Sequence, residues 1–591
     1  MEVPFDGQPE YTDVLVVGAG PSGLMCALAL ARYGVDTMIV ERREYGQIYG
    51  NADVIQPGTI ELWESLGLRE GLMREGTPIL AYASWSVDED SGELERQPQG
   101  PNVSLRDCRY PYEIALPIEN IEGLLRDDAA KYRLQVEQPW IPTDLVILPE
   151  EVGKPNAYTV RVILERPADS KWTQRKRTIY AKYVVGCDGA RSWVREKVGI
   201  KLERRERDDQ AVNWGVLTFT PETDFPDTMV KAVISTPDRG MIFWIPRPDS
   251  KARLYVPLSS KVDTRTTSRA AFLDAISNVV DHVFRPYTLK IKDCDWISTY
   301  KVIQAVASSF SAKNRVFIAG DAGHTHSAKT GQGANAAMKD SFNLAWKLAF
   351  VIRGWAKPTL LVTYEAERKK YASDLIAIDR DIATAISHGR NNARFYKKIW
   401  EERNRFITGV GVCYHSPLTP VEKPSPLAPR LTPGERLPPA AILRLSDWRP
   451  RNTHDLLQAD CTFKLLLFPG EMRYSVTMVD SFVSTLFKEL RSWTAPEREV
   501  LKLFAIFSDL KLWSHWTEAP ESVRDPMSVY VDDSMVPDVA DMELSTTGVY
   551  SLYDIQPEGC AVLIRPDAHI SLVSPINVLG AQEIARFLVR L

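Results

Sequence analysis

The chain has 591 residues, of which 44% are hydrophobic and 25% charged, and its formal net charge is −5 at pH 7. This length exceeds what one hydrophobic core serves, so we expect about three domains. The charge balance, with no concentrated basic run, argues against a nucleic-acid partner or a membrane surface. Seven scattered cysteines without a C-x-x-C, and an N-terminus without basic and apolar signal regions, predict a cytoplasmic protein with no membrane span.

The chain opens with a pattern typical of a strand-helix-strand unit. The apolar run 14–17 predicts a buried parallel strand, and the alanine- and leucine-rich run 24–33 predicts a helix that ends at Gly34. Residues 37–40 predict the second strand of the unit.

A glycine motif joins the first strand to the helix. Gly18, Gly20 and Gly23 have the G-x-G-x-x-G spacing, and a turn without Cβ atoms lets backbone N–H groups and the positive helix end approach a pyrophosphate. Glu41 ends the second strand, where it can accept hydrogen bonds from a ribose. Because strand, helix and acid occur in order, the motif predicts dinucleotide binding rather than a purely structural turn.

Two later strands end in acidic motifs. One apolar run ends in Asp188-Gly189, and another ends in Gly320-Asp321. The carboxyl edge of a parallel sheet is where ligands bind in such folds, although Asp-Gly by itself is equally typical of an ordinary turn.

A glycine-bearing loop follows the third motif. Gly331 and Gly333 lead into a predicted helix that runs to about residue 353, and the free N–H groups at its start would suit an anionic reduced ring. His324 and His326 lie before the loop, but no carboxylate or cysteine completes a ligand set, so we expect no metal site.

The remaining segments indicate further domains. Residues 79–115 predict a β-hairpin excursion, and 210–300 predict an antiparallel sheet inserted into the nucleotide domain. A proline-rich connector covers 416–439, and 440–591 predict a separate α/β unit. The predicted organisation is a first part of the nucleotide domain at 1–209, a substrate sheet at 210–300, a second part with a helical region at 301–415, a linker at 416–439 and a terminal domain at 440–591.

Three polar residues outside these motifs could be either structural or part of a functional site. Asp53 lies in a polar loop, where a solvated turn aspartate is the simpler interpretation. Arg247 and Tyr255 flank the turn 248–251 on predicted adjacent strands, where surface or interface packing is the simpler interpretation.

The three motifs, taken together in this order, resemble those of the flavoprotein aromatic hydroxylases. The phrase 320–335, Gly-Asp-Ala-Gly-His-Thr-His-Ser-Ala-Lys-Thr-Gly-Gln-Gly-Ala-Asn, is similar to the phenol 2-monooxygenase branch, and so is the helix segment 342–349. That branch carries a C-terminal thioredoxin-like domain without C-x-x-C. The resemblance implies an α/β fold: a Rossmann-like FAD-binding domain with an inserted antiparallel substrate sheet, plus a thioredoxin-like α/β domain.

The resemblance also implies roles for particular residues. Asp53 would accept the phenol proton, with Tyr255 paired to it and Arg247 favouring the anionic substrate. Glu41 would bind the adenosine ribose, Asp188 would lie near the pyrophosphate, and Asp321 would hold the ribityl chain. The residues implied in FAD binding are Gly18, Gly20, Pro21, Ser22, Gly23, Glu41, Arg42, Arg43, Asp188, Gly320, Asp321, Gly331, Gly333, Ala334 and Asn335.

The implied reaction is hydroxylation of a phenolic small-molecule substrate. NADPH or NADH would reduce FAD, O2 would add to give a flavin C4a-hydroperoxide, and its terminal hydroxyl would go to an electron-rich ring carbon. The branch usually has glycine at position 54, arginine at 58, glutamine at 118 and proline at 328, where this chain has Val54, Gly58, Ile118 and Ala328. We therefore expect a bulky phenol, such as one from secondary metabolism.

Several alternatives stay open from the sequence. Decarboxylative hydroxylation, dearomatisation and Baeyer–Villiger oxidation use the same fold, and a non-catalytic flavoprotein is also compatible. A disulfide reductase is disfavoured because the chain lacks a C-x-x-C and a second nucleotide motif. A homodimer is implied only by the resemblance.

Overall fold

The computed structural model describes most of the 591 residues, and these divide into two compact units. The described residues are 8–46, 50, 54–151, 154, 157–167, 172–204, 213–237, 240–258, 267–300, 304–327, 331–387, 392–421, 423–493, 495–508, 515–532 and 548–591. Unit 1 comprises Met1–Leu28, Thr37–Ser341 and Lys369–Val410, and unit 2 comprises Ala29–Asp36, Phe342–Arg368 and Gly411–Leu591.

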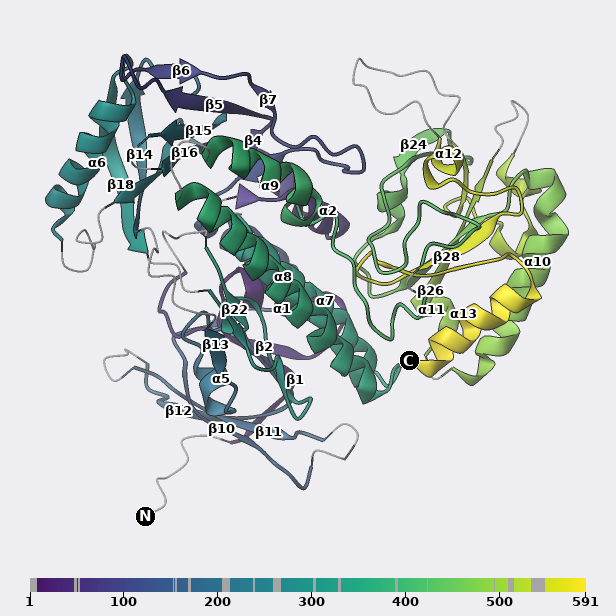
Figure 1. Cartoon of the computed structure of the whole chain (residues 1–591). Coiled ribbons are helices and arrows are strands. Elements are labelled where there is room, and N and C mark those ends of the chain that lie inside the picture. Colours follow the sequence, from purple (N-terminus) through teal and green to yellow (C-terminus); the bar gives the residue numbers. More distant parts are fainter. Residues whose placement is uncertain are drawn as a thin grey trace. The chain divides into compact units, whose positions relative to one another are not determined.

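A parallel sheet carries the nucleotide motifs of unit 1. Its strands run in the order β21-β12-β1-β2-β9, and an antiparallel pair, β10 and β11, extends from β12 (Figure 1). Their bounds are β1 Glu10–Val17, β2 Thr37–Val40, β9 Val136–Glu137, β10 Ile141–Ile147, β11 Val160–Glu165, β12 Lys176–Gly186, β20 Ser311–Ala312 and β21 Val316–Ile318.

Apolar runs explain why these strands form the centre of the sheet. Val14, Leu15 and Val16 of β1 are fully buried, as are Val184 and Val185 of β12. Parallel strands covered on both faces read as continuous hydrophobic runs, and this is the pattern found here. The parallel pairing brings the carboxyl ends of β1, β12 and β21 to one edge.

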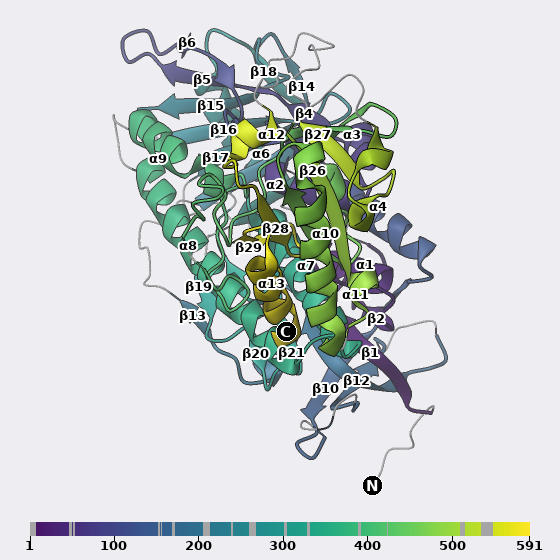
Figure 2. The same cartoon turned by 90° about the vertical axis from the view of Figure 1, so that its right-hand side faces the viewer.

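A second, mostly antiparallel sheet of unit 1 runs in the order β18-β14-β17-β16-β15-β5-β6, and β7 also pairs with β5 (Figures 1 and 2). It takes strands from the excursion as well as from the inserted region, since β5 pairs with β15 in parallel. The bounds are β5 Ala81–Val87, β6 Leu94–Arg96, β7 Gly100–Pro101, β14 Asn213–Thr223, β15 Lys231–Thr236, β16 Gly240–Pro246, β17 Ala252–Leu258 and β18 Leu289–Tyr300.

One helix of this region was not predicted from the sequence. Helix α6, Arg269–Val283, begins after the N-cap Ser268 and packs Phe272, Ile276 and Val280 into the core of the second sheet. The i, i+4 spacing of these three residues is the helical signal that could have revealed it.

Smaller elements complete unit 1. Two three-stranded sheets have the orders β3-β8-β4 and β13-β19-β22. The strands are β3 Val54–Ile55, β4 Thr77–Ile79, β8 Glu113–Ala115, β13 Leu202–Arg204, β19 Ala305–Ala307 and β22 His324–Thr325. The helices are α2 Pro57–Ser65, α3 Arg69–Glu75, α4 Ile118–Lys131, α5 Trp193–Lys197, α8 Val362–Ser387 and α9 Asn392–Ile407, with the 3-10 turn η1 Gly320–Ala322; the turn η3 Pro358–Leu361 belongs to unit 2. Helices α1, Pro21–Arg32, and α7, Gly333–Ile352, contribute residues to both units, as does α8.

Unit 2 contains a seven-stranded mixed sheet in the order β24-β23-β27-β26-β25-β28-β29. Strands β25, β26 and β27 are parallel, β28 pairs antiparallel with β25, and β29 pairs antiparallel with β28. Helices α10 and α13 lie together (Figure 2). The bounds are β23 Ala441–Arg444, β24 Arg449–Asn452, β25 Phe463–Phe468, β26 Leu501–Phe507, β27 Val529–Asp532, β28 Cys560–Ile564, β29 Ile570–Ser574, α10 Met472–Glu489, α11 Glu497–Val500, α12 Val549–Tyr553 and α13 Val578–Arg590, with the turns η4 Thr453–Leu456, η5 Leu490–Ser492, η6 Trp516–Glu518 and η7 Glu521–Val523.

The proline-rich stretch differs from the extended connector that its composition indicates. Leu431 and Leu437 are fully buried in the hydrophobic core of unit 2, together with Ala428. The prolines therefore prevent a helix here, while the leucines between them pack into the core of unit 2 and anchor the segment. Within the described residues, no helix has the length and apolar character to cross a bilayer.

Candidate functional site

The glycine turn between β1 and α1 combines close packing with open space. A Cβ at Gly18, where φ is +99°, would lie 2.5 Å from the Cys187 carbonyl oxygen, and a Cβ at Gly23 would lie 1.8 Å from that of Gly18. A Cβ at Gly20 would meet no heavy atom within 4 Å. Two glycines are thus required for packing, whereas the third leaves backbone N–H groups open to a ligand.

Glu41 reaches back to this turn from the end of β2. Its Oε2 accepts the backbone N–H of Ala19 at 2.9 Å, and its Oε1 accepts the backbone N–H and Nε of Arg43 at 2.9 and 3.0 Å. Although burial opposes ionisation, the hydrogen bonds from Arg43 and Ala19 lower the pKa of Glu41. An ionised acceptor therefore stands beside the glycine turn.

Asp188 lies at the same edge, directly after Cys187. Its Oδ2 accepts the backbone N–H of Val194 at 3.0 Å, whereas Oδ1 is buried without a hydrogen-bond partner among the described residues. Burial raises the pKa of Asp188 above its ordinary value. A buried acceptor with an open lone pair fits a ligand that brings its own donor, and this fit supports a bound dinucleotide.

The Gly320-Asp321 motif lies close to the glycine turn between β1 and α1. A Cβ at Gly320, where φ is +62°, would lie 3.1 Å from Ser22 Oγ, and its backbone N–H donates to Asp340 at 3.0 Å. Asp321 is exposed to solvent, yet desolvation by the surrounding protein raises the pKa of its carboxyl group. The nearby His326 and His324 act in the opposite direction and lower this pKa. An accessible side chain in dense surroundings is expected where a residue lines a recess.

The loop before α7 is tied to the strand that follows Asp53. Asn335 is 1% exposed; its Nδ2 donates to the carbonyl oxygens of Val54 at 2.8 Å and Gly331 at 2.7 Å, and its Oδ1 accepts the Gln56 N–H at 2.9 Å. Asn335 therefore fixes the distance between the two loops rather than pointing freely into a cleft.

The other residues implied in FAD binding have varied positions. Pro21 begins α1, and Ser22 Oγ shares a hydrogen bond with Ser341 Oγ at 2.8 Å. Arg42 is exposed, whereas Arg43 pairs with Glu41. Gly333 and Ala334 lie half-buried in the first turn of α7.

Asp53 lies outside the described residues, but its neighbour Val54 begins β3. Val54 and Tyr255 pack against the same small cluster, formed by Ile79, Ala115 and Ile245. The structure therefore brings β3, which begins one residue after Asp53, and the Tyr255 strand to one cluster.

Arg247 follows β16 and is 6% exposed. Its Nη1 donates to Thr218 Oγ1 at 3.1 Å, and Arg253 Nε donates to the same oxygen at 3.1 Å. Thr218 pairs with Arg253 across β14 and β17, two residues along from the pair of Val216 with Tyr255. Because side chains alternate along strands, Arg253 and Tyr255 share one face of the sheet.

A buried polar network was missed by sequence reasoning. Glu113, fully buried on β8, accepts from Lys231 Nζ at 3.0 Å, Gln56 Nε2 at 2.6 Å and Asn102 Nδ2 at 2.9 Å. Despite burial, the charge of Lys231 and these hydrogen bonds lower the pKa of Glu113. A lone glutamate within the apolar run Glu-Ile-Ala-Leu was the available signal.

His324 has a structural partner. Its Nε2 lies 2.9 Å from Asp340 Oδ2, the atom that also accepts the Gly320 N–H. Within the part of the chain that the structure describes, no three His, Cys, Asp or Glu side chains are grouped to hold a metal.

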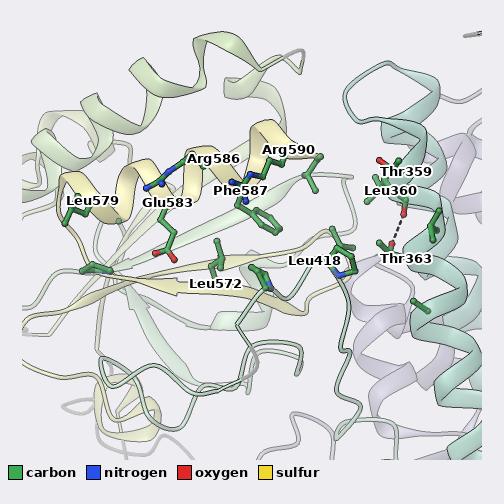
Figure 3. A pocket seen from close by; sticks show the side chains of 17 residues that line it. Thr359, Leu360, Thr363, Leu418, Leu572, Leu579, Glu583, Arg586, Phe587 and Arg590 are labelled. Atoms are coloured by element: carbon green, nitrogen blue, oxygen red, sulfur yellow. Dashed lines mark hydrogen bonds between the residues drawn. The ribbon is translucent and has the colours of Figure 1, made fainter.

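A groove of about 960 Å³ lies in unit 2, away from all the predicted site residues in sequence (Figure 3). Its walls are mostly apolar, and Glu583, Arg586 and Arg590 of α13 add charge. The apolar lining includes Leu360, Val362, Leu418, Leu572, Leu579 and Phe587.

Two protein-family models match most of the chain. Residues 11–379 match the model of the FAD binding domain, and residues 404–591 match the phenol hydroxylase C-terminal dimerisation domain.

Individual relatives match over nearly the full length. The chain is 31% identical to the 3-hydroxybenzoate 4-monooxygenase of Comamonas testosteroni, over 96% of this chain and 93% of that protein. It is 30% identical to the FAD-dependent monooxygenase terD of Aspergillus terreus, with coverage of 95% and 93%, and 29% identical to the phenol 2-monooxygenase fsqG of Aspergillus fumigatus, with coverage of 96% and 94%.

Solved structures share the fold. The flavin-dependent monooxygenase PieE in complex with FAD and substrate aligns with a TM-score of 0.70 at 19% identity, covering 98% of both chains. Aklavinone-11 hydroxylase in complex with FAD and aklavinone aligns with a TM-score of 0.69 at 21% identity, covering 99% of this chain and 100% of the other.

Proposed function

Because this chain belongs to the FAD-dependent aromatic monooxygenases, we propose that it hydroxylates a bulky phenolic substrate between the nucleotide motifs and the Tyr255 face of the second sheet. The enzymes of this family use FAD, NAD(P)H and O2. FAD, when bound, would carry the reducing equivalents of NAD(P)H to O2 and activate the oxygen for transfer; the protein supplies binding, orientation and proton transfer.

The residues at the carboxyl edge of the parallel sheet would hold FAD. The open backbone at Gly20 would face the pyrophosphate, Glu41 the ribose, and Asp321 the ribityl chain. The unpartnered Oδ1 of Asp188 supports this arrangement, because a dinucleotide carries hydroxyl donors that the chain itself does not offer there.

Asp53 would act on the substrate as the general base. Ionising a phenol makes its ring carbons more nucleophilic, so an Asp53 carboxylate paired with Tyr255 would take the phenolic proton. Arg247 would favour the resulting anion. The shared cluster of Val54 and Tyr255 supports this role, and it is the observation that carries the proposal.

One experiment tests the function directly. Purified full-length protein is given NADPH or NADH with a panel of phenols, salicylates and polycyclic hydroxyarenes, and cofactor consumption, peroxide and product mass are measured together. We expect stimulated consumption with a product 16 mass units heavier. Loss of carbon dioxide, a dearomatised ring or an inserted ester oxygen would each identify the corresponding alternative chemistry.

The C-terminal domain supports a homodimer as the working form. Its family model is described as a dimerisation domain and covers residues 404–591. We place the enzyme in the reducing cytoplasm, where the seven free cysteines would stay unpaired. Sedimentation of the purified chain at twice the monomer mass of 66.6 kDa would support the dimer.

A further inference from the structure

A buried carboxamide links the second sheet to the loop before α7. Gln56 follows β3 and is 1% exposed. Its backbone N–H donates to Asn335, and its side-chain Nε2 donates to Glu113 Oε1 at 2.6 Å. A Cβ at Gly331 would lie 3.1 Å from that nitrogen, so the carboxamide borders the loop directly.

The Lys231–Glu113 pair determines which way the carboxamide faces. Lys231 Nζ lies 3.2 and 3.0 Å from the two Glu113 oxygens, which keeps this fully buried carboxylate ionised. An ionised carboxylate only accepts hydrogen bonds, so it must face the NH2 end of Gln56. The amide carbonyl oxygen is therefore turned away from Glu113.

That carbonyl oxygen has no donor within the described chain. Gln56 Oε1 is buried and makes no hydrogen bond with the described residues, although the backbone N–H and Nε2 of the same residue are both paired. A buried acceptor without a donor destabilises the folded protein, so its retention points to a donor that arrives with a ligand.

We propose that Gln56 Oε1 accepts a hydrogen bond from the N3–H group of the FAD ring, and that Glu113 and Lys231 are positioning residues that orient it. This inference rests on the proposed function, with the flavin ring taken to lie against the loop 331–335 at the start of α7, where free backbone N–H groups suit an anionic reduced ring. The proximity of the Gln56 carboxamide to Gly331, together with the backbone hydrogen bond from Gln56 to Asn335, places Gln56 beside this loop and favours the ring over a phenolic hydroxyl as the donor.

The test pairs a protein variant with a modified cofactor. Gln56→Leu removes the acceptor, and N3-methyl-FAD removes the donor. Dissociation constants for both cofactors are measured by flavin fluorescence on full-length wild type and variant. We expect Gln56→Leu to weaken FAD binding about tenfold, and N3-methylation to cost wild type at least about fivefold more than it costs the variant.

Asn102→Leu is the matched control. It removes the 2.9 Å hydrogen bond to the other Glu113 oxygen, and the side-chain hydrogen bonds of Asn102 within the described chain go to Glu113 and Ile79, not to the loop 331–335. It should leave the N3-methyl penalty as large as in wild type. Gln56→Met serves if the leucine variant does not fold, as judged by thermal unfolding of the FAD-free protein.

Two outcomes would overturn the inference, and a third would overturn the proposed function. An equal N3-methyl penalty in wild type and Gln56→Leu would remove Gln56 as the partner of N3. Unchanged FAD binding with weakened phenol binding in the variant would assign the donor to the substrate. Failure of wild type to bind FAD would instead overturn the proposed function itself.

Discussion

Asp53 is the residue on which the proposed chemistry depends most directly. Replacing it by asparagine keeps the size of the side chain but removes the base, so we expect Asp53→Asn to lower the rate of hydroxylation by about 10²–10⁴-fold while FAD stays bound. Product formation and flavin absorbance measure the two effects separately. Asp90→Asn, in an exposed turn, is the control and should hydroxylate like wild type. Undiminished turnover in Asp53→Asn would remove Asp53 from the mechanism.

The glycines of the first turn differ in what a methyl group would meet. Gly20→Ala points into open space, so the fold should persist while a pyrophosphate loses its close approach, and FAD should bind at least about tenfold more weakly. Gly23→Ala would collide with the Gly18 carbonyl and should also destabilise the protein by about 1–3 kcal/mol. Denaturant unfolding of the FAD-free proteins and FAD titration distinguish the two. Equal unfolding free energies for both variants would contradict this division.

Helices α7 and α8 and the β28–β29 turn are joined by a buried ion cluster in unit 2. Glu367 accepts from Arg565 Nη1 and from Lys347 Nζ, each at 2.7 Å, and all three side chains are fully buried. Glu367→Gln would leave two buried cations short of a counter-charge, so we expect a loss of about 3–5 kcal/mol of unfolding free energy. The exposed Glu558→Gln should change it by less than about 0.5 kcal/mol. A loss below 1 kcal/mol for Glu367→Gln would show that water already solvates the Lys347 and Arg565 charges.

The same cluster predicts a loss of stability in acid. Despite burial, Arg565 and Lys347 hold the pKa of Glu367 well below 4.5, and Arg565 and His569 lower that of Asp567. Below about pH 4.5 the unfolded chain binds more protons than the folded one, so unfolding free energy falls as pH falls. The stabilisation that the ionised Glu367 and Asp567 contribute is complete above about pH 5. Denaturant unfolding between pH 6 and pH 3 should show a shallower decline in Glu367→Gln than in wild type, and parallel curves would contradict the assignment.

The two compact units share continuous helices. Helix α7 passes from unit 1 to unit 2 between Ser341 and Phe342, and α1 passes between Leu28 and Ala29. Because a helix forms cooperatively, we expect one calorimetric transition for the full chain, not two. FAD at a hundred times its dissociation constant should raise the unfolding free energy by about 2.7 kcal/mol and shift the whole transition. Two peaks, of which FAD moves one, would show that the units unfold independently.

Local patterns account for what could be predicted from the sequence. The strand 37–40 matches β2, the helix that Pro57 begins matches α2, and the order of the three motifs identified the family, as the comparisons confirm. These signals depend on neighbours within one turn or one strand, so one chain suffices to read them. The domain boundaries and the roles of the site residues stay predictions.

Contacts between distant segments decided the rest. Gly58 departs from the arginine of the phenol hydroxylase branch, and only the structure gives a reason: a Cβ there would lie 2.4 Å from the Gly409 carbonyl oxygen. Glu113 and Lys231 are 118 residues apart, and nothing local to either predicts the pair. Hydrophobic period and glycine spacing are written in consecutive residues and predicted the strand-helix-strand unit and dinucleotide binding, while the resemblance of the three motifs implied the fold class and FAD. Buried charges, close backbone approaches and an unpartnered carboxamide arise only when separate strands meet, because burial itself is a property of the tertiary structure.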